Sequence, residues 1–142
     1  VLPGGTNVVP GEARLSIDVR HANDDVRAEA VDEIYAVARG LAAVRGLDVT
    51  FEPGLDQPAV ACDAALTARL SAAAEAEGFR PEPVPSGAGH DAVVMAGLCP
   101  VAMLFVRSPG GISHHPNESV HRDDVRAALA VMVRFLEGEL SV

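Results

Sequence analysis

The chain contains few aromatic residues, few cysteines and no excess of basic side chains. Aromatic residues make up 4% of its 142 positions while 49% are apolar, so a core has to be built from Ala, Val and Leu. The formal net charge is −9, and such an acidic surface repels phosphate backbones, which excludes nucleic acid as an expected partner. Cys62 and Cys99 lie outside any CxxC pattern, which favours free thiols in a reducing cytoplasm over a disulfide.

Long apolar runs are also missing. No stretch reaches the roughly 18 apolar residues of a membrane span, and no basic segment followed by an apolar core marks a signal peptide. We therefore expect a cytoplasmic protein without a membrane partner. The length allows one ordinary domain or two small ones. The chain opens on Val-Leu-Pro rather than on Met, which indicates a processed or trimmed piece.

The first part of the chain predicts a small α+β unit. Residues 13–20 alternate between apolar and polar side chains, as in a half-buried strand. Asn23 can cap a helix that ends near Arg45, and residues 48–52 alternate again. Two strands are marginal by themselves, so a further strand or a partner chain has to complete the sheet. Residues 53–58 form a turn-rich linker.

The second part of the chain predicts an α/β layer pattern, in which helices alternate with strands. Its most distinctive segment is residues 101–106, a continuous apolar run of strand length that is typical of a buried parallel strand. The next expected helix is capped by Asp63 and ended at Gly78, with Leu66, Leu70 and Ala73 or Ala74 inward. A short strand over residues 80–84 and a helix over 89–96 should follow. A last helix is capped by Asp123, with Val125, Leu129, Met132, Leu136 and Leu140 inward.

Three of the five histidines lie between Ser86 and Glu118. The apolar run ends directly before a loop that carries His114, His115 and Glu118, and sites in α/β sheets form at the carboxyl ends of strands. Imidazole and carboxylate groups are common ligands of zinc and manganese. Neighbouring residues of an extended loop point apart, so we expect one of the two histidines to be a ligand. Glu118 could then be a hydrogen-bond partner of an imidazole. A solvated His-His loop is the alternative.

The loop before residue 91 is the second candidate site. Gly87 and Gly89 flank Ala88 and let backbone amides approach a ligand closely. His90 could donate a hydrogen bond to the same group, and a helix that begins there adds a positive dipole end for an anion. A tight loop with a packed histidine explains the same residues.

Asn7 and Arg20 are the polar candidates of the first part. Arg20 lies at the end of the predicted strand on its exposed face, and arginine suits a bidentate grip on a carboxylate. A surface arginine paired with Asp18 or Asp24 is the alternative, and spacing alone favours it. The chain lacks a nucleophile elbow, a Walker loop and an HExxH motif.

Three segments together resemble the C-terminal half of the M20 metallopeptidase family. They read N-V-V-P-G-E-A-R-L-S-I-D-V-R-H over residues 7–21, P-S-G-A-G-H-D-A over 85–92 and G-I-S-H-H-P-N-E over 111–118. The most similar branch is the amidase/hydantoinase–carbamoylase type, which contains hydrolases of N-carbamoyl-L-amino acids, allantoate and ureidopropionate. The resemblance covers nearly the whole chain.

The resemblance implies a mixed α/β architecture with two parts. Residues 1–58 would be the later part of a lid domain that also forms a homodimer, and residues 59–142 would be the end of a catalytic domain. It also implies a divalent-metal hydrolase with two Zn or Mn ions in each intact site. By similarity, His114 is a metal ligand, Asn7 and Arg20 bind the carboxylate of a small-molecule substrate, and Ala88, Gly89 and His90 contact its amide or ureido end.

The sequence departs from the family by the absence of its first half. The other metal ligands and the general-base glutamate are not present, so no residue of this chain is expected to be catalytic and the isolated chain should be inactive. Two alternatives remain: a peptidase or deacylase of the same family, and a non-catalytic dimerisation or binding module.

Overall fold

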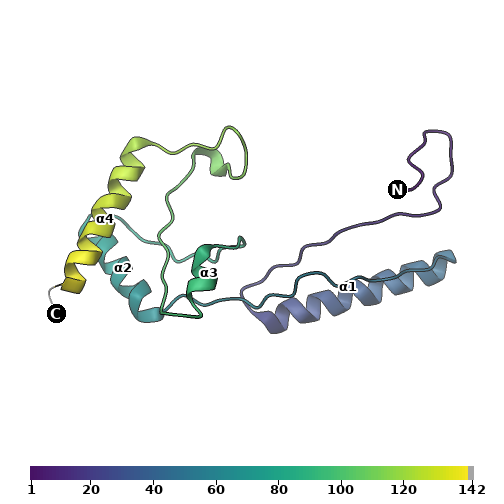
Figure 1. Ribbon diagram of the computed structural model, residues 1–142, viewed down its shortest axis with the longest axis horizontal. Helices are drawn as coiled ribbons and strands as arrows, with labels where there is room; N and C mark the ends of the chain where they lie inside the picture. The colour runs from purple at the N-terminus through teal and green to yellow at the C-terminus, as the bar shows by residue number, and fades with distance from the viewer. Residues whose placement is uncertain (141–142) are drawn as a thin grey trace. The chain divides into compact units, whose positions relative to one another are not determined.

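The computed structural model describes residues 1–140, which form two compact units (Figure 1). The first unit spans Val1–Ala59, and the second begins at Val60. The first unit contains one long helix, α1 (Asp24–Arg45). No helix in the described range is both long enough and apolar enough to cross a membrane. The elements of the second unit are α2 (Ala64–Ala76), α3 (Asp91–Met95), the 3₁₀ turn η1 (Pro109–Gly111) and α4 (Arg122–Leu140).

The described residues contain no β-strand, so the predicted mixed α/β architecture is wrong for them. A strand exists only when a neighbouring strand accepts and donates its backbone hydrogen bonds. Between residues 1 and 140 the only such pairing is an isolated antiparallel bridge between Leu2 and Glu12. Without a ladder the apolar face of residues 13–20 is not covered, and Leu15 is 84% exposed. The four segments with strand-like patterns, residues 13–20, 48–52, 80–84 and 101–106, are irregular.

Helix α1 begins and ends where its sequence predicts. The side-chain oxygen of Asn23 accepts hydrogen bonds from the backbone N–H groups of Asp25, at 2.8 Å, and Val26, at 3.3 Å. Gly46 closes the helix in the left-handed conformation, with φ of 65°, which glycine adopts without the steric cost of a Cβ. The predictions for the two ends of this helix are confirmed.

The segment after α1 runs back along the helix (Figure 1). The ring of Phe51 lies 4.3 Å from that of Tyr35, centroid to centroid. Further along, Asp56 pairs with Arg27 at 2.8 Å. No residue of α1 is fully buried, so ring contacts and ion pairs, rather than a closed apolar core, hold this segment against the helix.

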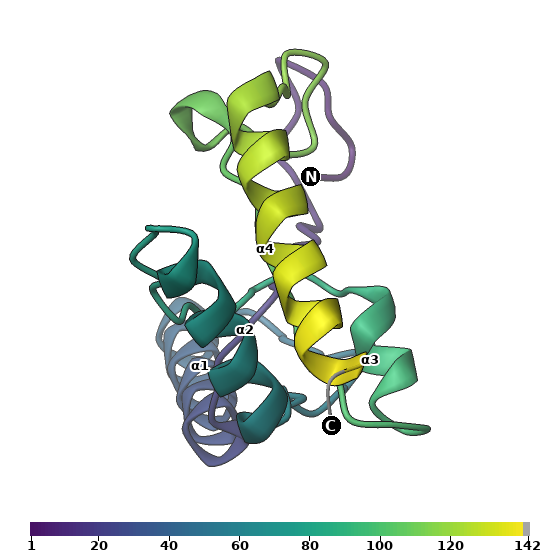
Figure 2. The same ribbon diagram turned by 90° about the vertical axis from the view of Figure 1, so that its left-hand side faces the viewer.

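Helices α2 and α4 pack side by side and enclose the small core of the second unit (Figure 2). Leu70, Ala73 and Ala74 of α2 are buried against Val131 of α4. This burial confirms the predicted inward face of α2. Asp63 caps that helix by accepting a hydrogen bond from the N–H of Leu66 at 2.8 Å. Fully burying a residue such as Leu70 stabilises a fold by about 1.5–3 kcal/mol.

The predicted inward face of α4 is wrong. Val131 and Phe135 face α2, whereas the predicted stripe is 38% to 59% exposed over Val125, Leu129, Met132 and Leu136. The side chain of Leu140 lies outside the described residues. Apolar residues recur on two sides of this helix, and one neighbouring helix can cover only one of them. The helix also begins at Arg122, so Asp123 lies in its first turn rather than at its cap.

Candidate functional site

The predicted site residues divide between the two units. The first unit holds two of them and the second holds four: Asn7 and Arg20, then Ala88, Gly89, His90 and His114. Asn7 is exposed in the turn that connects the two sides of the Leu2–Glu12 bridge. Each group is therefore described within its own unit, and the roles of these residues stay predictions.

Arg20 pairs with Asp18 two residues earlier. Its Nε donates to both oxygens of that carboxylate, at 2.9 and 3.0 Å, and its Nη2 lies 2.5 Å from Oδ2. The side-chain hydrogen bond is the main reason why the pKa of Arg20 is raised and the pKa of Asp18 is lowered. This is the surface pairing that spacing alone favours. Arg14 and Glu12 repeat the arrangement earlier in the same segment.

The imidazole of His90 is held by its own loop and by a neighbouring segment. Its Nε2 lies 2.7 Å from the hydroxyl oxygen of Ser86, which also accepts the N–H of Ala88 at 3.2 Å. The ring meets Phe105 edge to face, with centroids 5.5 Å apart. His90 is half-buried and immediately precedes α3, but its side chain does not cap that helix. The loop thus fixes the ring rather than leaving it in solvent.

The loop around His114 is held through its backbone. His114 has a φ of 56°, and it is the only non-glycine residue with a positive φ in the described chain. The carboxylate of Glu118 accepts the backbone N–H of His114 at 2.8 Å. Nδ1 of His115 accepts the N–H of Asn117 at 3.1 Å. A left-handed conformation costs a residue with a Cβ roughly 1–2 kcal/mol, and the Glu118 contact offsets part of that cost.

An ion pair closes this loop at its base. Nε and Nη2 of Arg107 both lie 2.8 Å from Oδ1 of Asp124, at the start of α4. The hydrogen bond from Arg107 lowers the pKa of Asp124 and raises that of the arginine. The other oxygen of Asp124 and the hydroxyl of Ser108 are buried without a partner among the described residues. A single oxygen of the Asp124 carboxylate therefore ties the loop to α4.

The described residues do not assemble a metal site. No three His, Cys, Asp or Glu side chains come together in residues 1–140 in a way that could hold a metal ion. Within the loop, Glu118 and Nδ1 of His115 already accept backbone N–H groups. His114 thus stands as a single candidate ligand, and a catalytic metal usually needs three protein ligands.

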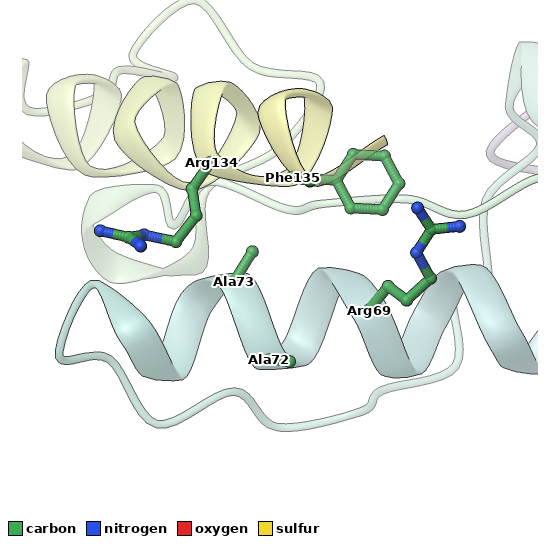
Figure 3. A pocket seen from close by; sticks show the side chains of 6 residues that line it. Arg69, Ala72, Ala73, Arg134 and Phe135 are labelled. Carbon is green, nitrogen blue, oxygen red and sulfur yellow. The ribbon is translucent and has the colours of Figure 1, made fainter. Parts of the chain in front are cut away.

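An open depression between α2 and α4 contains none of the predicted site residues (Figure 3). It is lined by Arg69, Ala72, Ala73, Arg134, Phe135 and Gly138. The guanidinium of Arg69 lies 5.8 Å from the ring centre of Phe135, and Arg134 pairs with Glu77. Both arginines are engaged by neighbouring side chains, so the depression is not a ready anion site.

The sequence reasoning missed two contacts at the candidate site. Ser86 was not singled out, although a serine four residues before the histidine of a glycine-rich loop can reach its ring. Glu118 was expected to contact an imidazole, whereas it binds a backbone N–H. No pattern in the sequence marks the positive φ of His114, because that conformation comes from the fold of the loop.

Comparison with known proteins gives a match over nearly the whole chain. The model of peptidase family M20/M25/M40 matches residues 3–138, a range that includes all the predicted site residues. A probable allantoate deiminase from Oryza sativa subsp. japonica is 40% identical over 95% of this chain. An N-carbamoyl-L-amino acid amidohydrolase from Geobacillus stearothermophilus is 33% identical over 93%, and an allantoate amidohydrolase from Bacillus subtilis (strain 168) is 35% identical over 82%.

These relatives are much longer than the matched region. The chain spans 30%, 32% and 28% of the rice, Geobacillus and Bacillus proteins, respectively. It therefore corresponds to under a third of each relative.

Proposed function

We propose that this chain, which belongs to peptidase family M20/M25/M40, is part of a hydrolase acting on C–N bonds of linear amides or ureido acids. The observation that carries this proposal is the similarity to relatives named for allantoate and for N-carbamoyl-L-amino acids, at 33–40% identity over more than 80% of the chain. The substrates we propose are N-carbamoyl-L-amino acids, allantoate and ureidopropionate.

Within that function the residues of the first unit bind the substrate's carboxylate. Arg20 offers a planar set of donors that matches a carboxylate, and Asp18 occupies that set in the structure. An exposed ion pair contributes only about 0–1 kcal/mol, so a substrate carboxylate can displace Asp18 at small cost. Asn7 adds a neutral donor. Holding the carboxylate fixes the distance from that end of the substrate to the bond that breaks.

The loop of the second unit binds the other end of the substrate in this proposal. Backbone amides near Ala88 and Gly89, with the ring of His90, would donate to the oxygen of the amide or ureido group. Donors aimed at an oxygen that gains negative charge during hydrolysis are worth about 10²–10³ in rate. The hydrogen bond between Ser86 and Nε2 of His90 supports this role, because a fixed donor needs no reorganisation when the charge develops.

The family is metal-dependent, and we propose His114 as one ligand of a site for two Zn or Mn ions. Since residues 1–140 supply no further set of ligands, the remaining ligands have to come from outside them. The chain alone is then inactive. We further propose that the whole protein works in the cytoplasm as a homodimer that associates through the first unit.

Two other functions compete with this proposal. The family's name makes a peptidase or deacylase the nearest alternative, and it differs only in the group beyond the C–N bond. A non-catalytic dimerisation or binding module is the alternative from another class. It requires no metal and no turnover in any version of the protein.

The decisive experiment compares this chain with the longest protein encoded in frame with it. Each is supplied with Mn²⁺ or Zn²⁺ and assayed against allantoate, ureidopropionate, N-carbamoyl amino acids and dipeptides. We expect ammonia or amino acid release from the ureido substrates by the longer protein alone. Hydrolysis of dipeptides only would favour a peptidase. No turnover and no bound metal in the longer protein would support the binding module.

A matched pair of variants tests the carboxylate grip. Arg20→Ala should raise KM strongly in the longer protein, because it removes the donors to the substrate carboxylate. Arg14→Ala should leave KM unchanged. It is a matched control, since both arginines form the same exposed pair with an acid two residues earlier. Equal effects of the two substitutions would remove Arg20 from the site.

A further inference from the structure

The ring of His90 is fixed from two sides by residues that the proposed function does not otherwise use. The hydroxyl of Ser86 contacts Nε2 at 2.7 Å, and Phe105 lies edge to face against the ring. The hydrogen bond with Ser86 constrains which nitrogen of His90 carries the proton, whereas the contact with Phe105 constrains only the plane of the imidazole ring. The two contacts can therefore be separated by experiment.

The position of the hydroxyl proton follows from the hydrogen bonds of Ser86. A serine hydroxyl has one proton to donate and two lone pairs that accept. One lone pair accepts the N–H of Ala88 at 3.2 Å. Within the described chain the hydroxyl proton has two acceptors: Nε2 of His90 at 2.7 Å and the carbonyl oxygen of Ala88 at 3.5 Å. The second distance is far beyond the usual 2.7–2.8 Å of an O–H···O bond, so Nε2 is the better acceptor within the chain.

We infer that Ser86 is a positioning residue that holds His90 as the neutral tautomer protonated on Nδ1. When Nε2 accepts a hydrogen bond, the single ring proton of a neutral imidazole has to be on Nδ1. The hydrogen bond of the ring with Ser86 is made by Nε2. The N–H at Nδ1 is then the donor that the loop presents to a ligand.

This assignment narrows the substrate class, a step that rests on the proposed function. An N–H donor needs an acceptor oxygen, which an amide or ureido group supplies through its carbonyl. A free amino group is an ammonium ion at neutral pH and offers no acceptor. A site with this tautomer therefore selects substrates whose nitrogen is acylated or carbamoylated, and it does not retain the free amino acid that hydrolysis releases.

Nitrogen-15 NMR of this chain, at a pH where His90 is neutral, tests the tautomer directly. In the unmodified chain Nδ1 should show the shift of a protonated ring nitrogen and Nε2 that of an acceptor. Ser86→Ala should move the tautomer ratio toward Nε2–H, the form that free histidine prefers, by about fivefold for one lost hydrogen bond. Ser86→Thr keeps the hydroxyl and should restore the original ratio.

Two controls separate this inference from a general loosening of the loop. Phe105→Leu removes the ring contact and leaves the hydroxyl, so the tautomer ratio should not change. Ser16→Ala removes an exposed serine of the other unit and should also have no effect. The inference is overturned if Nε2 carries the proton in the unmodified chain, or if Ser86→Ala leaves the ratio where it was.

Kinetic measurements on the longer protein distinguish a failure of this inference from a failure of the proposed function. If His90 donates as proposed, Ser86→Ala should lower kcat more than it raises KM for ureido substrates, and Ser86→Thr should recover most of the loss. A tautomer shift without any hydrolysis of ureido substrates would support the positioning by Ser86 and reject the proposed function. Hydrolysis that is unaffected by a confirmed tautomer shift would overturn the substrate-selecting part of the inference.

Discussion

The two histidine loops of the second unit are held in opposite ways. In the loop of His90 the ring is fixed, by the hydroxyl of Ser86 and by the edge of Phe105. In the loop of His114 the backbone is fixed, because Glu118 accepts the N–H of a residue in the left-handed conformation. The first arrangement determines which nitrogen of the His90 imidazole carries the proton. The second determines the direction in which the side chain of His114 projects from the backbone.

This difference matches the separate tasks that we propose for the two residues. A hydrogen-bond donor to a substrate has to present the correct tautomer, so its ring needs a partner. A metal ligand has to leave one ring nitrogen free and point it at a common centre, so its backbone has to be placed. Both loops nevertheless depend on the same helix pair. Leu104, next to Phe105, packs on the α2–α4 core, and Asp124 of α4 holds the base of the His114 loop.

The largest expected effect removes that shared support. Leu70→Ala should lower the free energy of unfolding of the second unit by about 2–5 kcal/mol, because Leu70 is buried in its small core. In urea unfolding of this variant, both loops should unfold together. Leu98→Ala, at an 81% exposed position of the same unit, should cost about 0.5 kcal/mol or less. If the loops open independently in Leu70→Ala, they do not share a support.

The next effect tests the backbone of the His114 loop. His114→Gly removes the Cβ from a left-handed residue, whereas His115→Gly removes it from a residue without positive φ. We expect the His114→Gly loop to be more stable than the His115→Gly loop by about 1–2 kcal/mol. Amide hydrogen exchange over residues 108–121 measures the difference. A less stable loop in His114→Gly would contradict the left-handed conformation.

A smaller effect should follow from removal of the carboxylate at Glu118. Glu118→Ala should raise the exchange rate of the His114 amide by the equivalent of about 1 kcal/mol, and Glu118→Gln, which keeps an acceptor oxygen, should do so less. The tautomer of His90 should not respond to either change. A change in that tautomer would show that the two loops are coupled rather than separately held.

The smallest effect concerns pH and the base of the His114 loop. The pKa of Asp124 is lowered in the folded chain by its bond to Arg107, while an unfolded aspartate titrates near ~3.9. Stability from this pair is therefore fully present above about pH 3.9 and is lost as the pH falls through the lower folded value. Asp124→Asn should flatten that acid limb in thermal unfolding. An identical acid limb in the variant would mean that other carboxylates cause it.

Local sequence signals predicted the helices well, because caps act within a few residues. Asn23, Asp63 and Gly46 satisfy the helix ends by contacts with groups close in the chain, so their effect can be read from spacing. The strand patterns failed, because alternation describes a face but does not supply the neighbour that a ladder requires. The face of α4 was wrong for a related reason: two apolar stripes were available, and which one packs depends on α2.

In the candidate site, too, the sequence predicts some features and not others. Glycine and histidine spacing points to His90 and to the pair His114 and His115, and only the family resemblance selects His114 from that pair. The roles of these residues remain predictions. The contacts that hold them could not be read from the sequence. Ser86 reaches Nε2 through the conformation of its own loop, and Glu118 reaches a backbone N–H in a loop where His114 has a positive φ. The conformation of the His114 loop depends on its anchor at Arg107 and Asp124 rather than on residue type.

The pairing of Arg20 with Asp18 has a consequence for how a carboxylate ligand would bind. The guanidinium is already neutralised by a neighbour, so binding exchanges one carboxylate for another instead of bringing an anion to a bare cation. An exchange of this kind leaves the number of ion pairs unchanged, and affinity should therefore depend little on ionic strength, unlike ordinary charge-driven association. Titration of the longer protein with a substrate carboxylate at low and high salt measures this dependence. A steep loss of affinity in salt would mean that Asp18 does not remain on Arg20 before the ligand arrives. If the affinity is instead insensitive to salt, Asp18 serves as a stand-in for the substrate carboxylate and keeps Arg20 in place between turnovers.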